Sequence, residues 1–264
     1  MGVDAGDADG DGWLDLFVTN LSNETNELYH NLKGSGTFSI DTYPAGLGDV
    51  SLLTSGWGTA FFDYDNDGDQ DLVVTNGHPM DDIELDSDIL TYAQRPFLFE
   101  NQGNGTYREI GRQLGPYFRA QDVGRGLAVA DYDNDGDLDL LFTPNNRKAT
   151  LLRNEGGDAA GHWITLRLVG VRANRDAVGA RVTVTAGGRR QIAEVRSASS
   201  YLSQNDMRLH FGLGAADRVE SIEIRWPLKA KTIERLGPIV ADQFLTLREG
   251  RGIVARSGPG TPTR

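Results

Sequence analysis

The sequence has no cysteine, only four histidines, and no long hydrophobic run. Without cysteine the chain can form neither disulfide bonds nor thiolate metal sites. No apolar stretch approaches the ~18–20 residues that a membrane-spanning helix needs, so we expect no membrane insertion. The first residues, Met1 to Asp4, do not resemble a signal peptide.

Motifs of the common catalytic classes are also absent. The histidines are dispersed and form no H-E-x-x-H pair, so we expect no zinc site. The sequence contains no G-x-S-x-G, no P-loop and no dinucleotide-binding fingerprint. We therefore expect the chain not to be an enzyme.

Charge is unevenly divided along the chain. Residues 1–150 carry 27 acidic and 8 basic side chains, whereas residues 151–264 carry 11 acidic and 18 basic ones. This shift predicts a domain boundary in the 150s. The arginines of the second part are scattered through alternating apolar and polar segments and form no cluster, so we expect no nucleic-acid binding.

One acidic nine-residue pattern occurs three times: D-A-D-G-D-G-W-L-D from Asp7, D-Y-D-N-D-G-D-Q-D from Asp63, and D-Y-D-N-D-G-D-L-D from Asp131. Carboxylates packed this densely repel one another unless a cation lies among them. Hard oxygen ligands on a tight loop suit calcium, and the glycine at position 6 permits the sharp turn. The sequence therefore predicts about three bound Ca²⁺ ions.

We assign the side chains at positions 1, 3, 5 and 9 of each loop as ligands, together with the backbone carbonyl at position 7, where the residue type varies. The predicted side-chain ligands are Asp7, Asp9, Asp11 and Asp15; Asp63, Asp65, Asp67 and Asp71; and Asp131, Asp133, Asp135 and Asp139. The predicted carbonyl ligands are those of Trp13, Asp69 and Asp137.

The loops are not EF-hands. An EF-hand needs a bidentate glutamate at position 12 and a helix on either side. Position 12 is Val18, Val74 or Phe142, and the run after position 9 is short and apolar in every copy. Such a run is typical of a buried strand.

Other features recur with the loops, which makes residues 1–157 a repeat array. A glycine stands five residues before each loop, and a strand-like segment that ends in asparagine follows it at Asn31, Asn101 and Asn154. This spacing predicts about four short strands per repeat, separated by glycine and asparagine turns. Repeats of this kind are propeller blades, which bury their faces against neighbouring blades.

The loop pattern, with its flanking Gly-x-Ala strand and its Asn-x-Gly-x-Gly-Thr-aromatic turn, resembles the FG-GAP or VCBS repeat of integrin-α-type propellers. The resemblance implies calcium-binding loops and a ring that usually has seven blades. Three loops cannot close a ring, since a propeller needs at least ~4 blades. We therefore expect a partial β-propeller from the C-terminal part of a longer protein, whose missing portion carries earlier blades and the export signal.

Longer alternating segments begin near residue 158. Residues 163–168, 180–184, 191–195, 208–211, 222–226 and 243–247 read as half-buried strands, which predicts a β-sandwich-like domain over residues 158–250. The stretch 251–264 is rich in glycine, proline, threonine and arginine and is predicted to be a disordered tail.

Within this second domain, the segments G-A-R-V from Gly179, S-Q-N-D from Ser203, H-F-G-L-G from His210 and I-R-W-P from Ile224 resemble the ASPIC and UnbV domain. With the repeats before it, the whole chain is similar to the cartilage acidic protein family and its bacterial relatives. The first loop departs from the other two in having Ala8 and Gly10, so we expect it to bind its ion with more flexibility.

The resemblance implies a calcium-binding extracellular or cell-surface interaction protein of the adhesion type, with a protein or glycan ligand as its partner. Two alternatives stay open. A carbohydrate-binding module would use exposed aromatics such as Trp13, Trp57 and Trp163; an accessory domain would serve a larger secreted enzyme. The acidic insert 81–88 is interpreted either as a further cation or partner contact or as a solvated loop.

Overall fold

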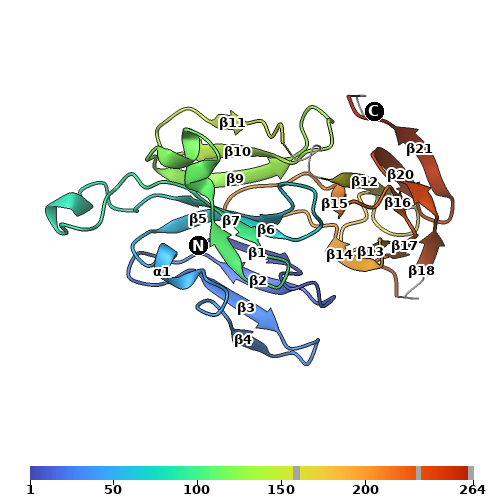
Figure 1. Ribbon diagram of the computed structural model, residues 1–264, viewed down its shortest axis with the longest axis horizontal. Coiled ribbons are helices and arrows are strands. Elements are labelled where there is room, and N and C mark those ends of the chain that lie inside the picture. The colour runs from blue at the N-terminus through green and yellow to red at the C-terminus, as the bar shows by residue number, and fades with distance from the viewer. Residues whose placement is uncertain (157–160, 230–232, 261–264) are drawn as a thin grey trace.

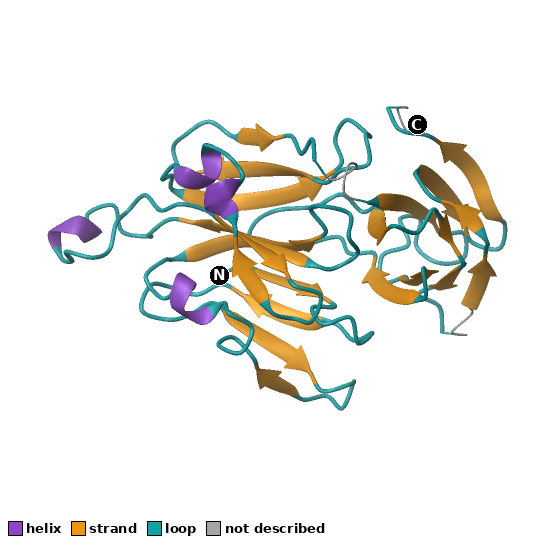
Figure 2. Cartoon of the chain, viewed as in Figure 1, coloured by secondary structure: helices purple, strands orange, loops and turns teal. Residues whose placement is uncertain are grey.

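The computed structural model describes residues 1–156, 161–229 and 233–260. Regular structure in these residues is almost entirely extended, as Figure 2 shows. Helix is limited to one short α-helix and three single turns of 3-10 helix, and no helix is long and apolar enough to cross a bilayer. The prediction of an all-β fold is confirmed. The helical segments are α1 (Gly48–Ser51), η1 (Ile83–Leu85), η2 (Gly111–Gln113) and η3 (Tyr117–Arg119).

The first part of the chain forms three antiparallel sheets, which lie fanwise beside one another in Figure 1. Each acidic loop joins the first and second strands of its sheet, as the repeat pattern predicts. The first blade contains β1 (Val3–Gly6), β2 (Asp15–Val18), β3 (Glu27–Asn31) and β4 (Phe38–Ile40). The second contains β5 (Gly56–Phe62), β6 (Asp71–Asn76), β7 (Phe97–Asn101) and β8 (Tyr107–Glu109). The third contains β9 (Gly124–Ala130), β10 (Asp139–Pro144) and β11 (Thr150–Leu152).

Adjacent blades are held together by apolar side chains on their facing surfaces. Phe17 of the first blade packs edge-on against Phe61 of the second, within a buried cluster that also contains Phe99. A separate cluster around Leu98 and Phe142 joins the second blade to the third. Full burial of each such side chain contributes about 1.5–3 kcal/mol, so the blade contacts are the main stabilising feature of the array.

The third blade corrects the expectation of four strands per repeat. Its sheet has the order β11-β10-β9, with no fourth strand among the described residues. The chain leaves the blade directly after β11, where the first two repeats continue into a glycine turn and an aromatic residue. The third repeat lacks that aromatic, and residues 157–160 lie outside the described part of the chain.

The second domain is a sandwich of two four-stranded sheets, with strand orders β15-β12-β20-β21 and β14-β13-β17-β18. Their inner faces share one apolar core in which Trp226, Ile164 and Ile222 are fully buried. The sandwich prediction is confirmed. Its strands are β12 (His162–Val169), β13 (Arg181–Ala186), β14 (Arg189–Glu194), β15 (Leu209–Gly214), β17 (Ser221–Arg225), β18 (Ile233–Leu236), β20 (Gln243–Arg248) and β21 (Gly252–Ser257), with the small pair β16 (Arg218–Val219) and β19 (Ile239–Val240) beside them.

The disordered tail predicted over residues 251–264 is wrong for its first part. Residues 252–257 form β21, which pairs antiparallel with β20. The glycine at position 252 adopts a φ of +68°, which allows the tight reversal that returns the chain along β20. Composition alone missed this strand because it sits on a sheet edge and exposes most of its side chains. Residues 261–264 lie outside the described part of the chain.

The segment between β14 and β15 leaves the sandwich and crosses the first strand of every blade in turn. Ser200 accepts the backbone N–H of Thr59 at 2.9 Å through its hydroxyl and donates its own N–H to the carbonyl of Val3 at 2.9 Å. Farther along, Ser203 Oγ accepts the Leu127 N–H at 3.1 Å. This segment of the second domain therefore contacts β1, β5 and β9, the first strands of the three blades.

An ion pair anchors the start of this crossing segment. Arg196 lies 2.6 Å from a carboxylate oxygen of Asp4, which is 2% exposed, and the other oxygen accepts the Phe61 N–H at 2.8 Å. Burial raises the pKa of Asp4, whereas the Arg196 charge and the hydrogen bond from Phe61 oppose the rise. The pair thus joins the first two blades to the second domain.

We predict that Arg196→Met lowers the free energy of unfolding at pH 7 by about 2 kcal/mol, because it leaves the buried Asp4 charge without its partner. The figure is reduced from the usual range because Arg196 is itself 35% exposed. Arg235→Met, which breaks the exposed pair with Glu223, is the matched control and costs less than about 1 kcal/mol. Equal losses in the two urea titrations would contradict this role of Arg196.

Candidate metal centre

The carboxylate at position 9 is held in the same way in all three loops. One oxygen accepts the N–H of the recurring asparagine, at 2.7, 2.8 and 2.8 Å in loops one to three. This asparagine ends the third strand in the first two blades and follows β11 in the third. The other oxygen accepts the N–H of loop position 2, at 2.9, 3.0 and 3.0 Å. These bonds fix the carboxylate against the loop. The carboxylates concerned are Asp15, Asp71 and Asp139.

The carboxylate at position 1 is likewise fixed by the loop itself. One of its oxygens accepts the N–H of the glycine at position 6, at 3.0, 2.8 and 3.1 Å in the three loops. The glycine therefore turns the chain so that its amide faces the first aspartate. The glycines have φ values of +90°, +91° and +106°, which L-residues with side chains rarely adopt.

Each loop gathers three carboxylates at one point. One oxygen each from positions 1, 3 and 9 lies within 4.8 Å of the others in every copy. These groups are Asp7, Asp9 and Asp15; Asp63, Asp65 and Asp71; and Asp131, Asp133 and Asp139.

The free oxygens of these groups fit a divalent cation. Five aspartates each have one buried oxygen without a hydrogen-bond partner; they are Asp7, Asp11, Asp63, Asp65 and Asp133. Unpaired buried carboxylate oxygens cost free energy, and a hard cation would satisfy them. In the protein alone, burial and the nearby Asp67 and Asp65 charges raise the pKa of Asp63 to about 8.

Positions 5 and 7 are placed differently from positions 1, 3 and 9. The carboxylate at position 5 accepts the N–H of position 7, at 2.9, 2.7 and 3.1 Å in the three loops. It stands beside the three-carboxylate group. Its second oxygen has no hydrogen-bond partner at Asp11, whereas at Asp135 it pairs with Arg153. At position 7 the side chain of Asp69 pairs with Arg189, and that of Asp137 accepts Asn66 at 3.0 Å. Coordination by the carbonyls at position 7 stays a prediction.

At position 4 the first loop has the same backbone conformation as the other two, and its greater flexibility stays a prediction. Its Gly10 has a φ of +72°, and the asparagines in the same place, Asn66 and Asn134, have φ values of +59° and +60°. All three are in the left-handed region, which asparagine tolerates better than most residues. Glycine at this position keeps the geometry and loses only the side-chain contacts.

Two residues that directly precede the recurring asparagines lie against the loops, although the sequence analysis assigned them no role. His30 Nδ1 is 3.2 Å from Asp15 and 3.6 Å from Asp9. In the third blade, Arg153 lies 2.6 Å from Asp133 and 2.9 Å from Asp135. The third loop therefore carries a built-in positive charge. The signal available in the sequence is their common place immediately before the recurring asparagine.

The asparagines link neighbouring loops. Asn101 donates from Nδ2 to the carbonyl of Ala8 in the preceding blade at 2.8 Å, and Asn154 donates to the carbonyl of Tyr64 at 2.6 Å. The second and third loops are thus tied to the loops before them. The recurrence of asparagine in the sequence was visible, but its contact with the preceding blade depends on the packing of the blades.

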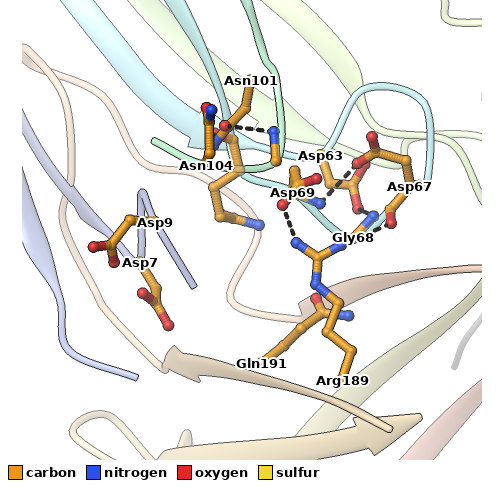
Figure 3. Close-up of polar contacts among 12 residues, drawn as sticks. Asp7, Asp9, Asp63, Asp67, Gly68, Asp69, Asn101, Asn104, Arg189 and Gln191 are labelled. Atoms are coloured by element: carbon orange, nitrogen blue, oxygen red, sulfur yellow. Dashed lines mark hydrogen bonds and ion pairs between the residues drawn. The ribbon is translucent and has the colours of Figure 1, made fainter. Parts of the chain in front are cut away.

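The second domain contacts the backbone of every loop through an arginine. Arg181 donates to the carbonyl of Gly12 at 2.6 Å, and Arg208 donates to that of Asp131 at 2.6 Å. Arg189 donates to the carbonyl of Asp67 at 3.2 Å and also pairs with Asp69. Figure 3 shows Arg189 reaching from the sandwich to the second loop. Each acidic loop therefore has one arginine of the second domain against its backbone.

The second loop is additionally enclosed by β15. His210 lies 2.6 Å from Asn66 Oδ1 through Nε2 and 2.9 Å from Thr165 Oγ1 through Nδ1. Burial lowers the pKa of His210 to about 3, so it is neutral at physiological pH. A Cβ at Gly212 would collide with a carboxylate oxygen of Asp63, so only glycine allows this approach.

The three tryptophans considered as a glycan-binding surface differ in their exposure. Trp163 is 2% exposed and packs against Phe244 and His210. Trp57 is half-buried beneath Arg125, with 4.2 Å between the guanidinium carbon and the ring centre. Trp13 is 38% exposed and is thus the one member of this set that is open to a ligand.

The acidic insert 81–88 forms a loop that contains η1. Glu84 accepts the N–H of Tyr92 at 3.0 Å, which closes the insert on itself. In the described part of the chain, the carboxylate groups close enough to share a cation all belong to the three loops and their neighbour His30. A further cation contact at the insert is therefore not supported by its geometry.

Comparison with known proteins gives matches for both parts of the chain. Residues 7–74 and 86–142 match the FG-GAP-like repeat family, and residues 170–254 match the ASPIC and UnbV family. Cartilage acidic protein 1 from Mus musculus is 27% identical over 261 residues, which covers 81% of this chain and 39% of the relative. The Homo sapiens protein of the same name is 27% identical over 259 residues, covering 81% and 38%. The chain spans less than half the length of these relatives.

Two substitutions test the loop geometry. Gly10→Asn should raise the free energy of unfolding by up to about 1 kcal/mol, because asparagine tolerates this φ and a Cβ there meets no atom within 4 Å. Gly136→Ala should lower it by about 1–3 kcal/mol, because its Cβ would overlap the Trp163 ring. Urea unfolding measures both, and a loss of stability in Gly10→Asn would show that the first loop has a different conformation.

Proposed function

The chain belongs to the proteins that combine FG-GAP-like repeats with an ASPIC and UnbV domain, and we propose that it is a calcium-stabilised interaction module that acts outside the cell. The observation that carries the calcium role is the set of unpaired, buried carboxylate oxygens, which recurs in the three loops. A cation in each loop would supply the missing partner for these oxygens. The ion would hold loop shape and perform no reaction.

The proposed place of action rests on the relatives and on charge. The similar proteins are named for cartilage and for acidity, and this chain has a net charge of −12. Calcium affinity in the ~10⁻⁴–10⁻³ M range suits extracellular modules, where the ion is abundant. We therefore expect weak, structural calcium sites that stay filled outside the cell.

The absence of catalytic motifs supports a non-enzymatic role. The histidine beside the second loop is held neutral between Asn66 and Thr165, and both of its ring nitrogens are engaged by these partners. The acidic groups of the loops would stay ionised when metal is bound, which prevents them from acting as general acids. Interaction with a protein or glycan at the cell surface is the role that remains.

Thermal unfolding in calcium and in EDTA tests the proposal. With free calcium at ~100 times the dissociation constant, each site adds about 2.7 kcal/mol to stability, so the melting temperature should rise clearly. Asp65→Asn should reduce this rise, because it weakens one site. In EDTA the same variant should melt at or above the wild-type temperature, because it removes one of the repelling charges.

Asp81→Asn is the matched control, since Asp81 is an exposed aspartate of the insert and belongs to no carboxylate group. It should keep the full calcium response. Identical melting temperatures of the wild type in calcium and in EDTA would overturn the calcium role. A response of equal size in magnesium would show that the loops bind divalent cations without preferring calcium.

A further inference from the structure

Among the described residues, the sheet of the third blade ends at β11, beside an apolar groove. No strand among the described residues pairs with the outer side of β11. Next to it lies a groove of about 720 Å³ between the second and third blades. The groove continues the apolar cluster that joins these blades. Its lining includes Tyr64, Leu98, Leu114, Phe118, Leu138 and Leu152.

The second blade shows what occupies the same place when a fourth strand is present. Tyr107 of β8 is buried in the cluster between the first and second blades. Its hydroxyl donates to the carbonyl of Gln70 at 3.0 Å, and its backbone N–H donates to the carbonyl of Ala45 at 2.8 Å. An aromatic side chain on the fourth strand therefore fills the space between two blades.

The groove at the third blade corresponds to this aromatic site. Asn154 bonds to the carbonyl of Tyr64 as Asn101 bonds to that of Ala8, so the two asparagines are equivalent. Leu138, which lines the groove, stands directly before the position 9 aspartate, as Gln70 does in the second loop. After Asn154 the sequence reads E-G-G-D-A-A, with no aromatic residue where Asn101 is followed by Q-G-N-G-T-Y.

We propose that β11 and this groove bind an extended segment of a partner protein, which adds a fourth strand to the third blade and places an aromatic side chain in the groove. An unpaired strand edge offers backbone donors and acceptors, and an adjacent apolar pocket selects the side chain. This inference rests on the proposed role as an interaction module and names the class of partner that the module takes.

A second copy of the chain is the less suitable occupant. Its two aromatics that follow a Gly-Thr turn are Phe38 and Tyr107, and both lie on strands already paired within their own blades. Tyr107 is in addition buried. Tyr107 could reach the groove of another molecule only if its own blade unfolded, whereas Phe38 is exposed on the edge strand β4. The proposed partner offers an extended segment that is free before binding, and docking of a second copy through β4 is an outcome that the test below distinguishes.

A labelled peptide with the sequence of residues 101–110, N-Q-G-N-G-T-Y-R-E-I, serves as the probe. Fluorescence anisotropy in calcium-containing buffer should show saturable binding to the full chain. The same peptide with alanine in place of tyrosine should bind at least about tenfold more weakly, because the aromatic side chain is the anchor. Hydrogen exchange should show new protection of the amides of β11 in the complex.

Two leucines of similar exposure supply matched variants. Leu114 is 42% exposed and lines the groove, whereas Leu141 is 38% exposed and is not among the residues that line it. Leu114→Asp should weaken peptide binding at least about tenfold, and Leu141→Asp should leave it unchanged. Both variants should keep the wild-type melting temperature within a few degrees, which shows that the fold is intact.

Three results would overturn the proposal. They are no peptide binding up to ~1 mM, equal binding by the tyrosine and alanine peptides, and a dimer of the chain in sedimentation that Leu114→Asp abolishes. The last result would assign the groove to a second copy. If the peptide fails to bind while calcium still raises the melting temperature, the strand-addition proposal is wrong and the calcium role stands.

Discussion

Mutual repulsion among aspartates in three buried turns is the constraint on which the rest of this structure depends. The chain holds each turn in one shape with backbone amides: two face the carboxylate at position 9, and the amide of the glycine at position 6 faces the carboxylate at position 1. These bonds place the charges close together and leave other oxygens of the same groups unpaired. Such an arrangement stores unfavourable energy unless a cation neutralises it.

The loops also connect the parts of the molecule. Asparagine side chains join the second and third loops to the blades before them, and arginines of the sandwich hold the loop backbones from the other side. The segment between β14 and β15 then crosses the innermost strands. Loop shape, blade packing and domain contact are therefore mechanically coupled. A change of loop conformation would therefore alter the hydrogen bonds between the loops and the second domain.

Much of this architecture follows from local sequence. The repeated loops and the strands after them depend on patterns within a few residues, and these predictions agree with the fold. What the sequence did not give depends on contacts between distant segments. The arginines that reach the loops, the crossing segment and the edge strand β21 have no local signal strong enough to identify them.

The central claim is that a divalent ion lies in each acidic loop, and the number of ions per chain tests it most directly. Native mass spectrometry of the chain, prepared in calcium and exchanged into volatile buffer, counts bound ions. The account predicts three calcium ions per chain, with one lost when the position 3 aspartate of any loop is replaced by asparagine. A chain that carries no calcium under these conditions, with all loops folded, would contradict it.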